Sequence, residues 1–272
     1  MRETARALHR VSLLLNACEK GEGRFPPTEL FNEGWMLRLL LDAVREVGAH
    51  AHPLAIEPGA TWFSEALLGS AFRPARRGDP LGEGFTSADA VLGHFAFHAG
   101  KAAGLRLLPD ARQFVVVEAK MFSGLSPGVR QAPGFNQAAR NIACMAEAIA
   151  AAGLAVDRLG SLGFFVVAPL PARRGPAGWK LEAQLDPCDI LATVRERIAG
   201  YERAGRAEAA RLRSWERSHV MPLVTRLADE RRLGVLSWEA CIDAVAGVDP
   251  AAGSELAGFY GRCVTFGRLA AA

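Results

Sequence analysis

The chain has 272 residues, half of them hydrophobic, with a formal charge of +3 and an isoelectric point near 8.7. This size allows a full hydrophobic core, so we expect one large domain or one domain with a helical appendage. The mild basic excess permits a nucleic-acid partner without indicating one, and no apolar run approaches the roughly 18 residues of a membrane span. The five cysteines are scattered without a CxxC pair, which is typical of a cytoplasmic protein that lacks disulfides and zinc knuckles.

Two amphipathic helices are predicted at the beginning of the chain. Residues 1–20 carry a leucine-rich apolar side, and a segment rich in glycine and proline ends this helix. We expect Thr28 to cap a second helix over about residues 29–47. The apolar stripe of that helix includes Glu33, which is either a functional acid or a residue that reaches solvent from the stripe's edge. Short strands are expected around residues 51–57.

Two longer strands follow, over residues 86–98 and 113–120. The first alternates between two faces, and the second is an apolar run rich in β-branched residues. The second strand ends in Glu118 and Lys120, which share one face because side chains alternate along a strand. A carboxylate and an ammonium group at the end of a core strand are costly to desolvate unless they are paired or bind a metal. This strand end is therefore the first candidate for a functional site.

The expected strand register brings a second carboxylate to the same place. An antiparallel hairpin centred near Ala103-Gly104 would put Asp89 directly opposite Glu118. Facing carboxylates repel each other unless a cation lies between them, and Mg²⁺, or Mn²⁺ in its place, prefers such oxygen ligands. The chain has only four lysines, and Lys120 would be placed to orient an attacking water or to stabilise charge on phosphorus.

The remaining elements are mainly helical. After a loop over residues 121–134, a helix is predicted over residues 136–152, with Gln137, Arg140 and Asn141 in one polar cluster near its start. A second buried strand is expected over residues 162–168. Three further helical segments are then predicted over residues 189–232, with a break near Pro222, and over residues 237–246 and 253–267. We expect residues 1–180 to form the core domain and residues 181–272 to form a helical C-terminal subdomain or flank.

This order of features resembles the PD-(D/E)XK nuclease superfamily. The resemblance covers residues 28–168 and rests on an acid in one strand, Asp89, followed by Glu118-Ala119-Lys120 at the end of the next strand. It implies an α/β fold with a restriction-endonuclease-like core, a mixed central sheet flanked by helices in the order α-β-β-β-α-β. One departure is that Ala88 stands where the superfamily usually has proline.

The resemblance also implies a function and a set of site residues. The activity would be Mg²⁺-dependent hydrolysis of phosphodiester bonds in nucleic acid, with DNA rather than RNA as the expected substrate. Asp89, Glu118 and the Ala119 carbonyl would bind the metal, with Glu33 as the acid from the first helix. Lys120 would act on the attacking water, and Gln137, with Arg140, would orient Lys120 or the scissile phosphate. The alternative is a catalytically inactive nucleic-acid-binding or assembly protein with the same fold.

Several other patterns have competing interpretations. Residues 124–128 match the G-x-S-x-G nucleophile elbow of α/β-hydrolases, but Pro127 lacks the N–H that the oxyanion hole requires. His50 and His52 could be two metal ligands, although no partner set accompanies them. The five tryptophans are more consistent with packing than with stacking on bases. The Arg/Glu-rich stretch over residues 195–217 is either a solvated helical face or a surface for phosphate or for a homodimer.

Overall fold

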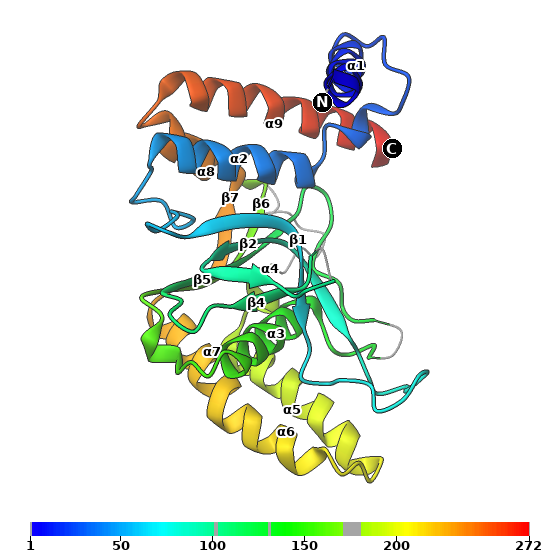
Figure 1. The fold of residues 1–272 in the computed structure, drawn as a ribbon, viewed down its shortest axis with the longest axis vertical. Coiled ribbons are helices and arrows are strands. Elements are labelled where there is room, and N and C mark those ends of the chain that lie inside the picture. Colours follow the sequence, from blue (N-terminus) through cyan, green and yellow to red (C-terminus); the bar gives the residue numbers. More distant parts are fainter. Residues whose placement is uncertain (1, 101–102, 130–131, 171–180, 272) are drawn as a thin grey trace.

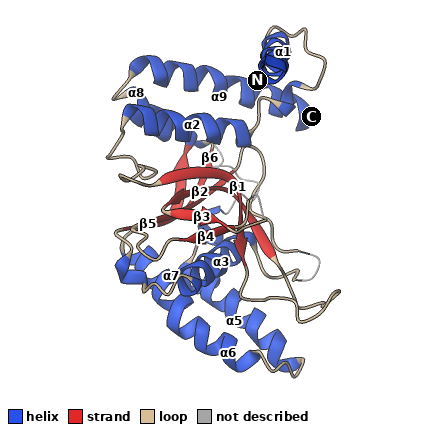
Figure 2. Cartoon of the chain, viewed as in Figure 1, coloured by secondary structure: helices blue, strands red, loops and turns tan. Residues whose placement is uncertain are grey.

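The computed structural model describes residues 2–100, 103–129, 132–170 and 181–271, arranged as three layers of helices, sheet and helices (Figures 1 and 2). Within these residues, five strands form one mixed sheet in the order β1-β2-β5-β6-β7. The pairs β1–β2 and β2–β5 are antiparallel, and the pairs β5–β6 and β6–β7 are parallel. The five strands are β1 (Thr61–Gly69), β2 (Phe85–Gly93), β5 (Gln113–Ala119), β6 (Ser161–Ala168) and β7 (Leu233–Ser237). The predicted α/β class is confirmed at this level.

Helices cover both faces of the sheet (Figure 1). One face packs against α2 (Glu33–Val47), α8 (Trp238–Ala246) and α9 (Pro250–Ala271). The other packs against α3 (Gln137–Ala151), α5 (Pro187–Arg203), α6 (Ala209–Trp215) and α7 (Met221–Asp229), with a π-helical turn, Glu216–Val220, between α6 and α7. The short elements are α4 (Leu181–Gln184) and two 3-10 turns, Pro27–Glu29 and Val156–Arg158, while α1 (Arg2–Glu19) lies at one edge of the molecule.

Strand β5 is the centre of the core, since every one of its residues is buried. Phe114 and Val116 contribute to the hydrophobic cluster on the α3 side, whereas Val115 and Val117 contribute to the cluster on the α2 side. This alternation is the one expected for a strand buried on both faces. Glu118 lies on the same face of β5 as Phe114 and Val116, so its side chain points toward α3.

The start of the chain differs from the sequence-based expectation. Asn32, and not Thr28, caps α2, because its side chain accepts a hydrogen bond from the Trp35 N–H at 3.0 Å. Glu33 therefore lies in the first turn of α2 and not within its buried stripe. The segment 51–57 consists of turns and irregular structure, so the predicted short strands there are wrong, and the first strand begins at Thr61.

The predicted strand over residues 86–98 is divided in two at its middle. Gly93 has a φ of 150°, and a Cβ atom there would lie 2.1 Å from the Gln113 carbonyl oxygen. The chain turns at this close approach and continues as β3 (Phe95–Phe97), which pairs with β4 (Leu105–Leu107) in a separate two-stranded sheet. The connection between β2 and β5 is therefore a small inserted sheet and not a simple turn.

The C-terminal segment is joined to the sheet more closely than a flank would be. Its helices lie within the predicted ranges, although α9 is longer than expected. The predicted break near Pro222 is wrong, because the helical chain is interrupted at residues 204–208 and continues through Pro222. The unpredicted strand β7 adds a fifth strand to the sheet beside β6. The predicted division at residue 180 stays a prediction, and residue 180 lies outside the described residues. None of the described helices is both long enough and apolar enough to cross a membrane.

Candidate functional site

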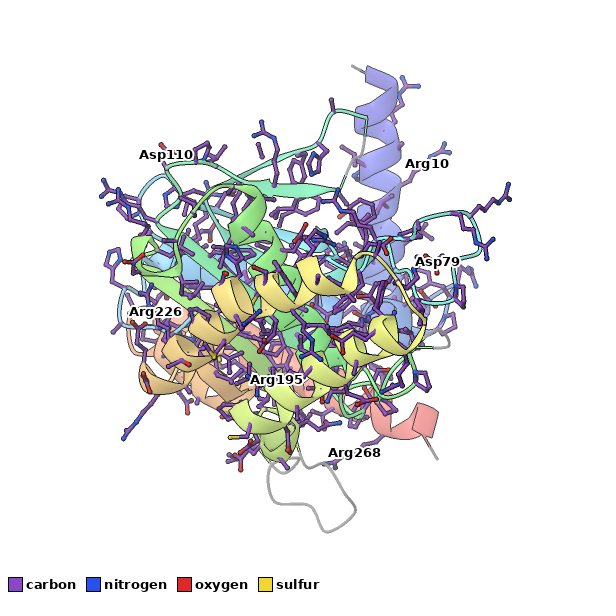
Figure 3. All side chains as sticks on the ribbon, turned by 90° about the horizontal axis from the view of Figure 1, so that it is seen from below. Arg10, Asp79, Asp110, Arg195, Arg226 and Arg268 are labelled. Atoms are coloured by element: carbon purple, nitrogen blue, oxygen red, sulfur yellow. The ribbon has the colours of Figure 1, made fainter. Side chains whose placement is uncertain are left out.

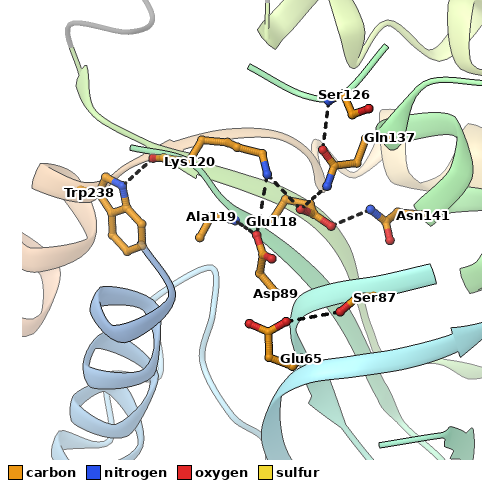
Figure 4. Close-up of polar contacts among 10 residues, drawn as sticks. All are labelled: Glu65, Ser87, Asp89, Glu118, Ala119, Lys120, Ser126, Gln137, Asn141 and Trp238. Atoms are coloured by element: carbon orange, nitrogen blue, oxygen red, sulfur yellow. Dashed lines mark hydrogen bonds and ion pairs between the residues drawn. The ribbon is translucent and has the colours of Figure 1, made fainter. Parts of the chain in front are cut away.

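The register of β2 and β5 is the one predicted from the sequence. The last pair of this ladder is Ala90 with Val117, so Asp89 and Glu118 occupy the next position of the same register. The paired region ends there, and the side chains of both acids meet where the two strands part (Figure 4). The site therefore begins at the point where the backbone pairing of two central strands stops.

Glu118 is fully buried and is held by two amides from α3. Its Oε1 accepts a hydrogen bond from Asn141 Nδ2 at 2.7 Å, and its Oε2 accepts one from Gln137 Nε2 at 2.6 Å (Figure 4). The two amides are four residues apart and so lie on one face of the helix. The sequence placed Asn141 in this polar cluster without giving it a role, whereas the structure makes it a direct partner of Glu118.

The Lys120 ammonium lies between the two carboxylates. Its Nζ is 3.3 Å from Glu118 Oε2 and 3.8 Å from Asp89 Oδ2. Asp89 Oδ2 also accepts a hydrogen bond from the Ala119 N–H at 2.7 Å. Lys120 is 12% exposed at its side chain and Asp89 is 29% exposed, so the site opens to solvent on the Asp89 side.

A residue from the C-terminal segment fixes the backbone of this strand end. Trp238, at the start of α8, donates from its Nε1 to the Lys120 carbonyl at 3.0 Å (Figure 4). The Lys120 N–H donates to the Val167 carbonyl at 2.8 Å. Trp238 is fully buried, which agrees with the expected packing role, but no sequence pattern connects it to residue 120.

The electrostatics of the site are dominated by the buried acid. Burial raises the pKa of Glu118 to about 8, and the neighbouring charge of Asp89 adds to this rise. The Lys120 charge and the Asn141 hydrogen bond oppose it. Ionised Glu118 is therefore unfavourable beside Asp89 unless further positive charge is supplied.

A pocket of about 430 Å³ lies outside the strand end, with Asp89 in its wall. Glu33 lines the same pocket from the first turn of α2, and Trp35 and Arg38 follow on that helix. Glu65 is a further wall residue that the sequence did not single out. It stands opposite Asp89 in the β1–β2 register, has a left-handed φ of 56°, and contacts Arg38 at 3.5 Å and Ser87 at 3.3 Å. A non-glycine residue in this conformation is uncommon and marks a local distortion of β1 beside the site.

The residues at the end of β5 fit a Mg²⁺ site that has only a few protein ligands. Mg²⁺ commonly uses one or two carboxylates and completes its coordination with water and substrate phosphate. Asp89 and Glu118 supply the pair, and the Ala119 carbonyl points toward Asp89, since the N–H and C=O of one strand residue point the same way. Among the described residues, no three or more His, Cys, Asp or Glu side chains are grouped to hold one ion. Glu33 thus faces the pocket without completing a three-acid cluster.

The other candidates have structural partners. Ser126 Oγ donates to the Gly128 carbonyl at 2.8 Å, and the Ser126 N–H donates to Gln137 Oε1 at 3.1 Å, so this loop supports Gln137 and does not form a nucleophile elbow. His52 is buried, with its Nδ1 accepting from the Leu54 N–H, while His50 is exposed. Arg140 differs from these, because its Nε is buried and has no hydrogen-bond partner among the described residues.

Comparisons of the chain with protein-family models, with curated proteins and with solved structures found no match.

Proposed function

We propose that the chain is a PD-(D/E)XK nuclease that hydrolyses phosphodiester bonds of nucleic acid, with DNA rather than RNA as the expected substrate and Mg²⁺ as cofactor. The observation that carries this proposal is the convergence of Asp89, Glu118 and Lys120 where β2 and β5 part. The element order α2, β1, β2, β5, α3, β6 supports it, because this is the α-β-β-β-α-β order of a restriction-endonuclease-like core, with β3 and β4 as an insertion.

The proposed mechanism gives each site residue a distinct task. When present, Mg²⁺ would polarise a phosphoryl oxygen and acidify an attacking water. Asp89 and Glu118 would hold it together with the Ala119 carbonyl, and Gln137 and Asn141 fix the Glu118 carboxylate in one orientation. The Lys120 ammonium supplies the positive charge that stabilises the charge developing on phosphorus.

The pocket beside Asp89 suggests how a strand of nucleic acid would approach. Its carboxylates repel phosphate unless cations are present, whereas the 39% exposed Trp35 offers a flat apolar surface. The Arg38 guanidinium lies 5.0 Å from the centre of the Trp35 ring and holds it in place. Bases stack on such exposed aromatic rings without strong sequence preference. We therefore expect a base next to the scissile phosphate to lie against Trp35, whose exposure sets it apart from the packing role predicted for the tryptophans.

A nuclease assay tests the proposal. The wild-type protein is incubated with single- and double-stranded DNA and RNA in the presence of Mg²⁺, Mn²⁺ or EDTA. We expect metal-dependent cleavage that falls about 100-fold or more in Lys120→Ala. Lys20→Ala, which removes an exposed lysine at the end of α1, is the matched control and should keep full activity. Equal cleavage by wild type and Lys120→Ala would contradict the assigned mechanism.

An inactive nucleic-acid-binding or assembly protein with the same fold is the second candidate. One observation favours it: both Glu118 oxygens already accept N–H donors, and the Lys120 ammonium already lies between the carboxylates. The site could thus be stable without a cation. Absence of cleavage of every substrate by the wild type, with binding of nucleic acid that Lys120→Ala leaves unchanged, would favour this candidate.

A further inference from the structure

Helix α1 exposes apolar side chains that no described residue covers. Every side chain of residues 6–14 is exposed, including Leu8 at 65%, Val11 at 50%, Leu13 at 53% and Leu14 at 44%. Figures 1 and 3 both show α1 at the margin of the molecule, and Figure 3 shows Arg10 pointing away from it. An isolated helix of this length is only marginally stable in water, so its stability must come from packing of its apolar face. The exposed face therefore indicates a partner.

An apolar groove lies at the same end of the molecule. It has a volume of about 560 Å³ and is bounded by the C-terminal turn of α1, by α2 and by α9. Leu39, Leu256 and Phe259 contribute to its apolar lining. Asp42, Glu46 and Glu255 also line it. A groove of this shape suits an amphipathic helix laid along it.

The charges of residues 6–14 of α1 and of the groove are complementary. Residues 6–14 contain Arg6, His9 and Arg10 and no acidic residue. The groove contains Asp42, Glu46, Glu255 and Glu19, of which Glu19 already pairs with Arg262 within the chain. The other three carboxylates form no ion pair among the described residues. A basic helix with an apolar face therefore fits this groove both in polarity and in charge.

We propose that the partner is a second copy of this chain, and that α1 of each copy lies in the α2–α9 groove of the other. Because α1 and the groove share one end of the molecule, a single two-fold axis could satisfy both contacts at once, as in an isologous dimer. An anionic membrane surface is the competing partner for a basic amphipathic helix. The acidic groove beside α1 disfavours it, since these carboxylates would be repelled by anionic lipid.

Sedimentation equilibrium of the full chain tests this proposal with variants that reverse the charges on α1, in the groove, or in both. The wild type should behave as a dimer of 29.1 kDa subunits. Arg6→Glu/Arg10→Glu and Asp42→Lys/Glu46→Lys should each raise the dimer dissociation constant by about tenfold or more, and the combined variant should recover the wild-type value. Arg203→Glu, at an exposed position on α5, is the control and should not change the dissociation constant. Circular dichroism verifies that each variant is folded.

Three outcomes would overturn the proposal. A wild type that stays monomeric at every concentration excludes the dimer, and its flotation with anionic vesicles would assign α1 to a lipid surface instead. A dimer that neither charge reversal weakens must use another face, such as the Arg/Glu-rich surface of α5 and α6. Weakening by both reversals without recovery in the combined variant would show that α1 does not contact the groove.

Discussion

At the scale of single residues, Glu118 combines two opposing environments. It is fully buried next to another carboxylate, yet three N–H donors point at its oxygens. The sequence predicted the position of Glu118 from period-2 alternation, which is a local property, and its encounter with Asp89 from an assumed antiparallel register that the β2–β5 pairing matches. It could not assign the partners on α3, since these depend on how the helix crosses the sheet.

The raised pKa of Glu118 predicts a pH-dependent stability of the metal-free protein. Because the folded-state pKa of about 8 exceeds the usual value of 4.5, the native state binds the proton more tightly than the unfolded state does. The free energy of unfolding should therefore decrease as the pH rises from about 5 to above 8. Glu118→Gln, which cannot ionise, should lack this part of the decrease.

Denaturant titrations of both proteins between pH 5 and 9, in EDTA, measure this difference. Saturating Mg²⁺ should restore wild-type stability at the alkaline end, because a ligand that binds only the native state stabilises it. Glu147→Gln, a change at an acid that pairs with Arg73 away from the site, serves as the control. Parallel pH profiles for wild type and Glu118→Gln would show that Glu118 titrates normally.

Asn141 should act as a positioning residue for Glu118. Its amide donates the hydrogen bond to Glu118 Oε1, and Asn141→Ala removes this bond from a fully buried site. We expect the Mg²⁺ concentration needed for half-maximal cleavage to rise about 10-fold to 100-fold, as is typical when a partner of a metal ligand is lost. Metal titrations of the cleavage rate measure this shift. An unchanged metal requirement together with lower stability would leave Asn141 only a packing role.

At the scale of secondary structure, the elements with a strong local sequence pattern were predicted, and those with a weak pattern were missed. Strand β5 and helix α3 were predicted because each has a marked apolar pattern and a clear first residue. For α3 the start is marked by Asn136, which is its N-cap. Strand β7 was missed because it is short, only partly buried and preceded by two arginines. Strand β1 is likewise mostly half-buried, so its alternation is weak.

The close approach at Gly93 makes a prediction at this scale. In Gly93→Ala, the new Cβ would lie 2.1 Å from the Gln113 carbonyl oxygen, and the φ of 150° would be strained. We expect a loss of about 2–4 kcal/mol in the free energy of unfolding. Gly69→Ala is the matched control, because a Cβ at the end of β1 meets no atom within 4 Å. A similar effect of both changes would contradict the proposed role of Gly93 where the chain leaves β2.

At the scale of the whole molecule, the site is assembled from distant parts of the chain. The pocket wall comes from α2, the acids from β2 and β5, and the supporting amides from α3. The C-terminal segment closes the sheet with β7 and covers the α2 side with α8 and α9. Sequence patterns predict elements one at a time, so they could not reveal that residues 233–271 complete the layer behind Lys120.

Trp238 is the residue through which this C-terminal layer should affect the site. Trp238→Phe keeps an aromatic ring in the core but removes the hydrogen bond to the Lys120 carbonyl. We expect a stability loss of about 1–2 kcal/mol and, because the Lys120 backbone is released, a kcat about tenfold lower with little change in KM. Cleavage kinetics and denaturant titrations on the same preparations measure both effects.

The control for Trp238 comes from the neighbouring helix. Tyr260 on α9 has its ring 6.5 Å from that of Trp238 and donates its hydroxyl to Glu239 at 2.7 Å, with no hydrogen bond to Lys120. Tyr260→Phe should therefore lower stability by about 1 kcal/mol and leave kcat unchanged. If both variants lost stability equally and both kept wild-type kcat, the C-terminal layer would support the fold without positioning Lys120. A kcat that is lower in Trp238→Phe but not in Tyr260→Phe would show that α8 positions Lys120 through Trp238.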